Sequence, residues 1–298
     1  MQLEHAVSAF LATYQGRDSS LPARLQWWAT QLGPCELADL EVGQIDTALF
    51  ALAQRGALRN QRGRGLVGTG RQLSVATINR YIAALGTLLK WAAKRRLVPR
   101  GWHSPLADVH QEPEHGRREV FLTAEQVRRL VDAARLASWR KLPAAILLAF
   151  TTGLRRGALE AMRWVDVDLD AGRALVQRTK SGKPIVAVLT LEVVAELRAI
   201  RPAGAAPSDL VFCGKHENRP HNWNGAFDRA LADIGAPPGV TWHTLRHSCA
   251  THLATRGAGL LQVADLMGHS NLSTTRRYSH LMVADRATMV ATHFGAVA

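Results

Sequence analysis

The sequence predicts a mainly α-helical protein of two domains, with a small antiparallel β-sheet in the second half. The chain has 298 residues, about twice the usual length of a single domain. Apolar residues recur with the 3.6-residue period of a helix over most of the chain. Period-two alternation, the pattern of a strand, is confined to one pair of short runs in the second half.

The first hundred residues contain four helical patterns separated by short polar or glycine-containing turns. These patterns cover residues 3–14, 21–32, 43–58 and 74–97. Between the third and fourth lies RNQRGRGLVGTGR, residues 59–71, with four arginines, several glycines and no acidic residue. Because such a stretch cannot bury a core, we expect a mobile loop there. A solvated loop and a loop that contacts a nucleic-acid backbone both fit this composition.

A domain boundary is predicted where residues 101–118 lose periodicity and combine prolines, glycines and mixed charges. We expect a helical domain at 1–110, a linker at 111–118 and a second domain at 119–298. Each of these domains is long enough to bury a core of its own.

The second domain opens with a helix whose first residues form a predicted capping box between Thr123 and Gln126. A second apolar helix follows from about Pro143. The runs 173–179 and 184–190 alternate on either side of a KSGK turn and predict a two-stranded hairpin. After this hairpin the chain returns to helical patterns.

The charge of the chain favours a polyanionic partner. Lys and Arg number 37 against 24 Asp and Glu, which leaves a formal net charge of +13. Nucleic acid is the leading candidate for such a basic protein. Two groups of basic side chains in the first domain are candidate DNA contacts: Arg59, Arg62, Arg64 and Arg71 in the glycine-rich stretch, and Lys90, Lys94, Arg95 and Arg96 after it. The second group also complements the dipole at a helix C-terminus.

Export and membrane insertion are not predicted. The chain shows neither the pattern of a signal peptide nor an apolar run near the ~20 residues that a membrane span needs. Its three cysteines are far apart in sequence and suggest neither a disulfide framework nor a C-x-x-C metal site. We expect a cytoplasmic protein associated with the nucleoid.

Two stretches of the second domain place cations in positions that suit a phosphate. In TTGLRRGALEAMRW, residues 151–164, a glycine turn launches a helix with Arg155 and Arg156 in its first turn. The helix dipole disfavours positive charge there, so an anion would complete the arrangement, although surface arginines are common. Lys180 lies at the tip of the predicted hairpin, where it could reach a ligand or serve solubility.

Residues 241–253, TWHTLRHSCATHL, gather His243, Arg246, His247 and His252 on one predicted helix. Their spacing spreads them around the helix, so some must face a ligand or solvent. A metal is not expected, because the Glu of the H-E-x-x-H motif is missing and no acidic third ligand is near. A buried, hydrogen-bonded histidine is the alternative for His247 or His252. Further along, His269 lies in a glycine turn and Tyr278 follows nine residues later; a lone tyrosine usually serves packing.

Taken together, TTGLRRG, TKSGK, HTLRH, MGHS and TTRRYSH stand in the order and spacing of the tyrosine recombinases, the phage-integrase family, which this sequence resembles. The resemblance covers roughly residues 120–285, and the helical first domain is similar to the family's core-binding domain. It implies these roles: Arg155 and Arg246 as the paired arginines, Lys180 as the hairpin lysine, His243 and His269 as assisting histidines, Tyr278 as the nucleophile and His247 as a supporting residue. One position departs from the family, since Ala158 stands where an acidic residue is common and Glu160 follows two residues later.

The chemistry implied by the resemblance explains these residue types. Attack on a phosphodiester places extra charge on the non-bridging oxygens, which forked guanidinium groups can stabilise. The tyrosine must lose its proton during attack, to His243 or to a neighbouring group. His269 would position the phosphate, and Lys180 would protonate the departing 5′ oxygen. The 3′-phosphotyrosine keeps the energy of the phosphodiester, so no metal, ATP or other cofactor is expected.

The expected partner is double-stranded DNA, bound by a homotetramer on two sites, with accessory DNA-bending proteins and no membrane. The C-terminal segment 283–298 contains the apolar-periodic VADRATMVATHF and either docks in a neighbouring protomer or packs on its own domain. The expected function is integration and excision of a mobile element. A Xer-like dimer resolvase, a type IB topoisomerase-like relaxing enzyme and a non-catalytic DNA-binding regulator are the alternatives.

Overall fold

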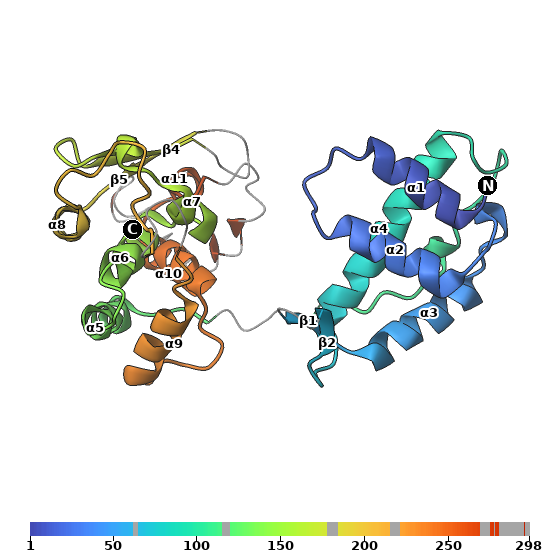
Figure 1. Ribbon diagram of the computed structural model, residues 1–298, viewed down its shortest axis with the longest axis horizontal. Helices are drawn as coiled ribbons and strands as arrows, with labels where there is room; N and C mark the ends of the chain where they lie inside the picture. Colours follow the sequence, from blue (N-terminus) through green and yellow to red (C-terminus); the bar gives the residue numbers. More distant parts are fainter. Residues whose placement is uncertain are drawn as a thin grey trace. The chain divides into compact units, whose positions relative to one another are not determined.

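The computed structural model describes residues 1–61, 65–114, 120–177, 184–214 and 221–268, together with residues 275, 276, 278, 279 and 295. The chain forms two compact units, Met1–Arg117 and Arg118–Ala298 (Figure 1). Each unit has its own hydrophobic core. Helices predominate in both units and the antiparallel sheets are small, which confirms the predicted fold class.

Four α-helices build the first unit in its described part. They are α1 (Leu3–Thr13), α2 (Leu21–Leu32), α3 (Val42–Arg55) and α4 (Val75–Lys94). The short 3₁₀ turn η1 (Leu37–Asp39) lies between α2 and α3, and a second one, η2 (Pro105–Ala107), follows α4. The start of α4 is fixed because the Ser74 side chain accepts a hydrogen bond from the Thr77 backbone N–H. Trp28 on α2 lies at the centre of this core and donates its indole N–H to the Tyr81 carbonyl on α4, 2.8 Å away.

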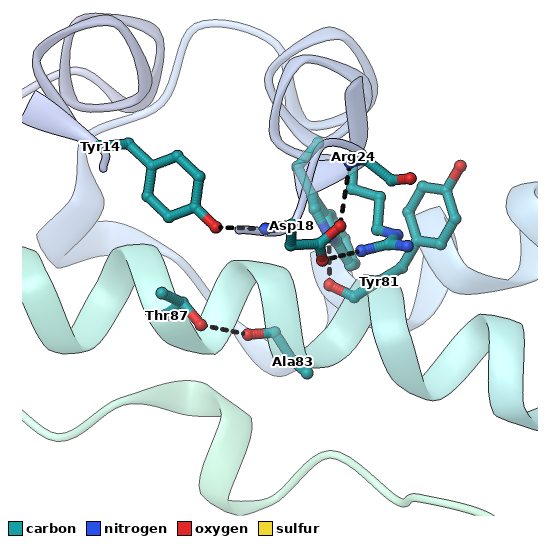
Figure 2. Close-up of polar contacts among 8 residues, drawn as sticks. Tyr14, Asp18, Arg24, Tyr81, Ala83 and Thr87 are labelled. Carbon is teal, nitrogen blue, oxygen red and sulfur yellow. Dashed lines mark hydrogen bonds and ion pairs between the residues drawn. The ribbon is translucent and has the colours of Figure 1, made fainter. Parts of the chain in front are cut away.

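The loop between α1 and α2 is held by Asp18 (Figure 2). Its carboxylate accepts from Arg24 at 2.7 Å and from the Ser20 backbone N–H at 2.9 Å, and its own N–H donates to the Tyr14 hydroxyl. The Ser20 N–H and the Arg24 guanidinium together lower the pKa of Asp18. Arg24 is therefore committed to a contact within this unit.

Residues 59–71 differ from the loop expected there, because a two-stranded antiparallel hairpin forms. Strand β1 (Leu58–Gln61) pairs with β2 (Gly65–Gly68), with Leu58 opposite Gly68 and Gln61 opposite Gly65. Hydrogen bonds between Ala57 and Thr69 and between Ala57 and Arg71 extend the pairing. Leu66 is 69% exposed, so backbone hydrogen bonds rather than a buried face hold the hairpin.

Residues 101–118 have the composition of a linker, but the residues at the start of this stretch pack against the first unit. The Trp102 indole N–H donates to the Ala38 carbonyl at 3.2 Å, and Val109 is buried in the first core. The first part of this stretch therefore belongs structurally to the first unit.

The second unit places seven α-helices and a three-stranded sheet around one core in its described part. The helices are α5 (Ala124–Arg135), α6 (Leu142–Thr152), α7 (Arg156–Ala161), α8 (Leu191–Ile200), α9 (Asn224–Asp233), α10 (Trp242–Thr255) and α11 (Leu260–Leu266), with the 3₁₀ turn η3 (Trp164–Asp166). The strands are β3 (Val167–Asp168), β4 (Arg173–Val176) and β5 (Ile185–Val188), in the order β3-β4-β5. Each neighbouring pair is antiparallel, so the predicted hairpin is present as β4 and β5.

Helix α6 is the central element of the second unit. Residues 142–149 are all buried, and the helix packs against α5, α8 and α10 (Figure 1). A helix that is apolar on all sides must lie inside a core. It ends at Gly153 in the left-handed conformation (φ 64°), and this turn leads the chain into α7. In the described ranges, no helix is long and apolar enough to cross a bilayer.

Candidate active site

The polar side chains of helix α10 lie on several faces of the helix, as their spacing in the sequence predicts. The helix begins at a capping box between Thr241 and Thr244, and the Thr241 backbone N–H donates to the Thr244 hydroxyl at 2.9 Å. Leu245 and Trp242 are buried in the core of the unit. On the remaining faces, Arg246 is buried, His247 is half-buried and His243 is exposed.

Arg246 is anchored by two backbone carbonyls from distant turns. Its guanidinium donates to the Met267 carbonyl at 2.7 Å and to the Gly153 carbonyl. Burial lowers the pKa of Arg246 to about 10, and the positive charge of Arg155 contributes to the shift. Arg246 therefore remains a cation at neutral pH, but its charge lacks the hydration that an exposed arginine has.

The turn at Gly153 can accept only glycine without rearrangement. A Cβ atom at this position would lie 2.4 Å from the Met267 sulfur, and the positive φ also disfavours a side chain. Two residues later, Arg155 has extended backbone angles and caps the start of α7. The turn thus brings Arg155 and the carbonyl that anchors Arg246 into the same short stretch.

Arg155, His243 and Arg246 line one cleft of about 460 Å³. Arg156, Asn224, Thr241 and Asp228 also contribute to its wall. Three guanidinium groups and an imidazole thus line a concave surface of the second unit. Such an arrangement suits an anion with several oxygen atoms, because forked N–H donors match phosphate geometry.

Arg156 has a different environment from Arg155. Its Nε donates to Glu160 at 2.7 Å, its Nη1 donates to the Asn224 side chain, and its guanidinium lies 5.1 Å from the centre of the Trp223 ring. Glu160 is therefore the partner of Arg156. Ala158, at the position where the family commonly has an acid, borders a separate cavity of about 550 Å³ beside β4.

Tyr278 lies against His247. The tyrosine hydroxyl is 2.6 Å from His247 Nδ1, and the tyrosine side chain is 2% exposed in a small cluster with Cys249 and Met267. The rings of His243 and His247 meet edge to face, with centroids 4.7 Å apart. Among the described histidines, His247 lies within hydrogen-bond distance of the tyrosine hydroxyl, a contact that the 31-residue separation in sequence could not reveal.

Two of the sequence-predicted site residues, Lys180 and His269, lie outside the described residues, which resume at Pro184 after Lys180 and stop at Gly268 before His269. Strand β5 begins at Ile185, five residues after Lys180, and Gly268 directly precedes His269. A Cβ atom at Gly268 would lie 2.0 Å from Ile185 Cδ1. Ile185 of strand β5 therefore lies against the glycine that precedes His269.

The candidate DNA contacts of the first unit are exposed wherever they are described. These residues are Arg59, Arg71, Lys90, Lys94, Arg95 and Arg96; Arg62 and Arg64 lie outside the described residues. Lys90 and Lys94 share the outer face of α4 with Arg80, Ala83 and Thr87, all exposed at helical spacing. No group of three or more His, Cys, Asp or Glu side chains that could hold a metal occurs among the residues that the structure describes.

Comparison with known proteins defines the class. Residues 120–284 match the model of the phage integrase family, and the chain belongs to this family, the tyrosine recombinases, whose enzymes carry out DNA strand exchange. The tyrosine recombinase XerC of Xanthomonas campestris is 29% identical over 292 residues, which cover 94% of this chain and 81% of that protein. XerC of Rhodospirillum centenum is 31% identical, over 93% of this chain and 80% of its own length.

Solved structures share the fold. The Tn1549 transposon integrase in complex with circular intermediate DNA superposes with a TM-score of 0.70 at 18% identity, over 93% of this chain and 95% of that one. A lambda integrase dimer bound to a COC′ core site gives the same TM-score, identity and coverage of both chains. At this level of identity the likeness concerns the fold.

Proposed function

We propose that this recombinase cuts and rejoins double-stranded DNA at specific sites through a covalent 3′-phosphotyrosine on Tyr278, and that it integrates and excises a mobile element. The observation that carries the chemical proposal is the shared cleft of Arg155, His243 and Arg246. Tyr278 contacts His247, and the ring of His247 contacts that of His243, which lines the cleft.

The cleft binds the scissile phosphate in this proposal. Attack by the tyrosine oxygen adds negative charge to the non-bridging oxygens, and fixed cations in a partly water-excluded site stabilise that charge strongly. Arg246 contributes a buried guanidinium held by two carbonyls, and Arg155 contributes a second one from the start of α7. His243 donates a further hydrogen bond to a phosphate oxygen.

Two proposed roles belong to residues outside the described ranges. Lys180 is the proposed general acid that protonates the departing 5′ oxygen, and His269 positions the phosphate. The contact between Ile185 and Gly268 supports their joint assignment, because it links the segments that carry them.

DNA binding by this chain is supported by its charge and by its structural neighbours. The Tn1549 integrase and lambda integrase structures contain DNA. In this chain the exposed face of α4 and the β1–β2 hairpin supply the proposed phosphate contacts in the first unit. Four protomers on two DNA sites, assisted by DNA-bending proteins, complete the proposed assembly.

Dimer resolution is the second candidate role. It is favoured by the XerC relatives, which match over more than nine-tenths of this chain. The chemistry is the same in both roles. A plasmid with two candidate sites in direct repeat separates them: intramolecular resolution without joining to a second molecule supports the resolvase, whereas joining of two different sites on separate molecules supports the integrase.

Covalent trapping tests the chemistry. The protein is incubated in EDTA without ATP with nicked duplexes tiled from the DNA that flanks its gene, and Tyr278→Phe serves as the control. We expect a detergent-stable adduct that is absent from Tyr278→Phe. An adduct in both proteins would assign the nucleophile elsewhere, and DNA binding without an adduct on any tile would favour the regulator. Relaxation of any supercoiled plasmid without recombinants would favour the topoisomerase.

A further inference from the structure

We propose that His247 is the general base that removes the proton from Tyr278. The proposal rests on the function proposed above, in which Tyr278 is the nucleophile, and it changes the role of His247 from a supporting residue to a catalytic one. His247 Nδ1 lies 2.6 Å from the tyrosine hydroxyl oxygen. This is within the distance that direct proton transfer requires.

The surroundings of the pair favour His247 over His243 for this task. His247 is half-buried between Tyr278 and His243, and the tyrosine is 2% exposed. His243 is exposed and lines the cleft with Arg155 and Arg246, where it faces the proposed phosphate. The two histidines, one helical turn apart, thus have separate places: His243 beside the phosphate and His247 beside the nucleophile.

The proton transfer fixes the state of the imidazole. His247 is neutral before attack, with its proton on Nε2 and a free electron pair on Nδ1 that accepts from the tyrosine. As the Tyr278 oxygen forms its bond to phosphorus, its O–H bond breaks and the proton passes to Nδ1. The bond from phosphorus to the 5′ oxygen breaks in the same step, and Lys180 gives that oxygen a proton. Religation reverses each transfer.

Charged and titratable groups around the pair support this direction of transfer. Within the described residues these groups are His243 and Arg246 on α10, Arg155 at the start of α7 and Cys249 in the cluster around the tyrosine. Arg246 interacts electrostatically with Tyr278, and its positive charge favours loss of the tyrosine proton. Burial raises the pKa of Cys249 to about 12, so its thiol stays protonated and cannot compete as the base.

The test compares His247→Gln with the matched variant His243→Gln in the full-length protein. Glutamine can still accept a hydrogen bond from Tyr278 but cannot take up its proton. The measurement is the single-turnover rate of adduct formation on a nicked duplex across a pH series. It is repeated with a fluorinated tyrosine, a more acidic phenol, installed at position 278.

We expect His247→Gln to slow adduct formation by about 10²- to 10⁴-fold at neutral pH, the usual contribution of general-base catalysis. The acid limb of the pH–rate profile should disappear, and alkaline pH and the fluorinated tyrosine should each restore part of the rate. His243→Gln should also be slow, but it should keep the acid limb and gain nothing from the more acidic nucleophile.

Other outcomes separate this proposal from the function it rests on. If His247→Gln forms adduct at the wild-type rate, or slows without any change in pH dependence or response to fluorotyrosine, His247 is not the base although Tyr278 remains the nucleophile. If the wild type forms no adduct, or Tyr278→Phe still forms one, the proposed function itself fails. Thermal melting and DNA affinity of each variant show whether the fold is kept, and His247→Asn provides a second variant if His247→Gln does not fold.

Discussion

At the scale of single residues, Arg246 both holds two turns of the fold together and lines the cleft that binds the phosphate in the proposed mechanism. A guanidinium has five N–H donors, and Arg246 uses donors on both terminal nitrogens for the carbonyls of Gly153 and Met267. These carbonyls lie two residues before Arg155 and two before His269. Because burial and Arg155 lower its pKa, a bound phosphate would relieve an unfavourable concentration of positive charge. In the proposed mechanism, phosphate binding is therefore coupled through Arg246 to the positions of the turns at Gly153 and Met267.

Replacing Gly153 by alanine tests this coupling. The new Cβ would lie 2.4 Å from the Met267 sulfur, in a backbone conformation with φ of +64°, so the Met267 side chain or the Gly153 backbone that anchors Arg246 must move. We expect the free energy of unfolding to fall by about 1–3 kcal/mol from the backbone strain. Adduct formation should fall by about 10²-fold, the usual effect of misplacing a catalytic group by an ångström. Thermal melting and single-turnover trapping measure the two effects.

Gly157→Ala is the matched control for this prediction. Gly157 lies on α7 with an ordinary φ, and a Cβ atom there would meet nothing within 4 Å. This variant should cleave as the wild type does. A Gly153→Ala protein that also cleaves at the wild-type rate would show that the carbonyl anchor of Arg246 is not needed for the chemistry.

The sequence predicted a set of site residues, but not how the described ones pair. The order of the five motifs pointed to the family, and the structure brings Arg155, His243 and Arg246 into one cleft. The contact of His247 with Tyr278 depends on how two distant segments pack, and no local pattern records it. Likewise, the carboxylate of Glu160 forms an ion pair with Arg156, and side-chain packing determines this pairing.

At the scale of elements, helices were predictable because they bury one face. The predicted helix at 21–32 matches α2, and the capping box between Thr123 and Gln126 is present at the start of α5. The β1–β2 hairpin was not predictable in this way, because its described side chains are exposed and leave no apolar alternation. Strand β3 has only two residues, too few for any periodic signal.

The hairpin is expected to contact DNA phosphates, and its charge is testable. Arg59 and Arg71 are exposed, and strand pairing holds the backbone that carries them. Replacing both with glutamine should weaken binding to specific and unrelated DNA by similar factors. The slope of log affinity against log salt should become shallower by about 0.9 for each lost contact. Fluorescence anisotropy at several salt concentrations provides the measurement.

Arg128→Gln serves as the control for the hairpin variants. Arg128 is exposed on α5 and already forms an ion pair with Glu125, so Arg128→Gln changes the net charge by the same amount as the single variant Arg59→Gln, without removing an expected phosphate contact. An equal change of slope for Arg128→Gln and Arg59→Gln would mean that overall charge, and not the hairpin, determines the salt dependence.

At the scale of the whole molecule, strand exchange needs protomers that cooperate on two duplexes. The net charge of +13 favours DNA binding but would not by itself assemble the proposed tetramer. A contact between protomers must supply that step. The lambda integrase structure contains a dimer on its core site. In this chain the proposed contact is the segment after Tyr278, residues 283–298, which lies outside the described residues apart from Gly295.

Truncation after residue 282 should separate cleavage from recombination. If residues 283–294 form the helix that their periodicity predicts, Val283, Ala287, Val290 and Phe294 share one apolar face that a neighbouring protomer can bury. The truncated protein should bind one site and form adduct normally, yet give no synaptic complex and no recombinants. Val290→Asp should reproduce this loss in the full-length chain, whereas Thr292→Asp, on the opposite face, should recombine normally. Normal recombination by the truncated protein would exclude docking in trans. Loss of both adduct formation and recombination would indicate that the segment packs on its own domain, because its removal would then disturb the fold around Tyr278.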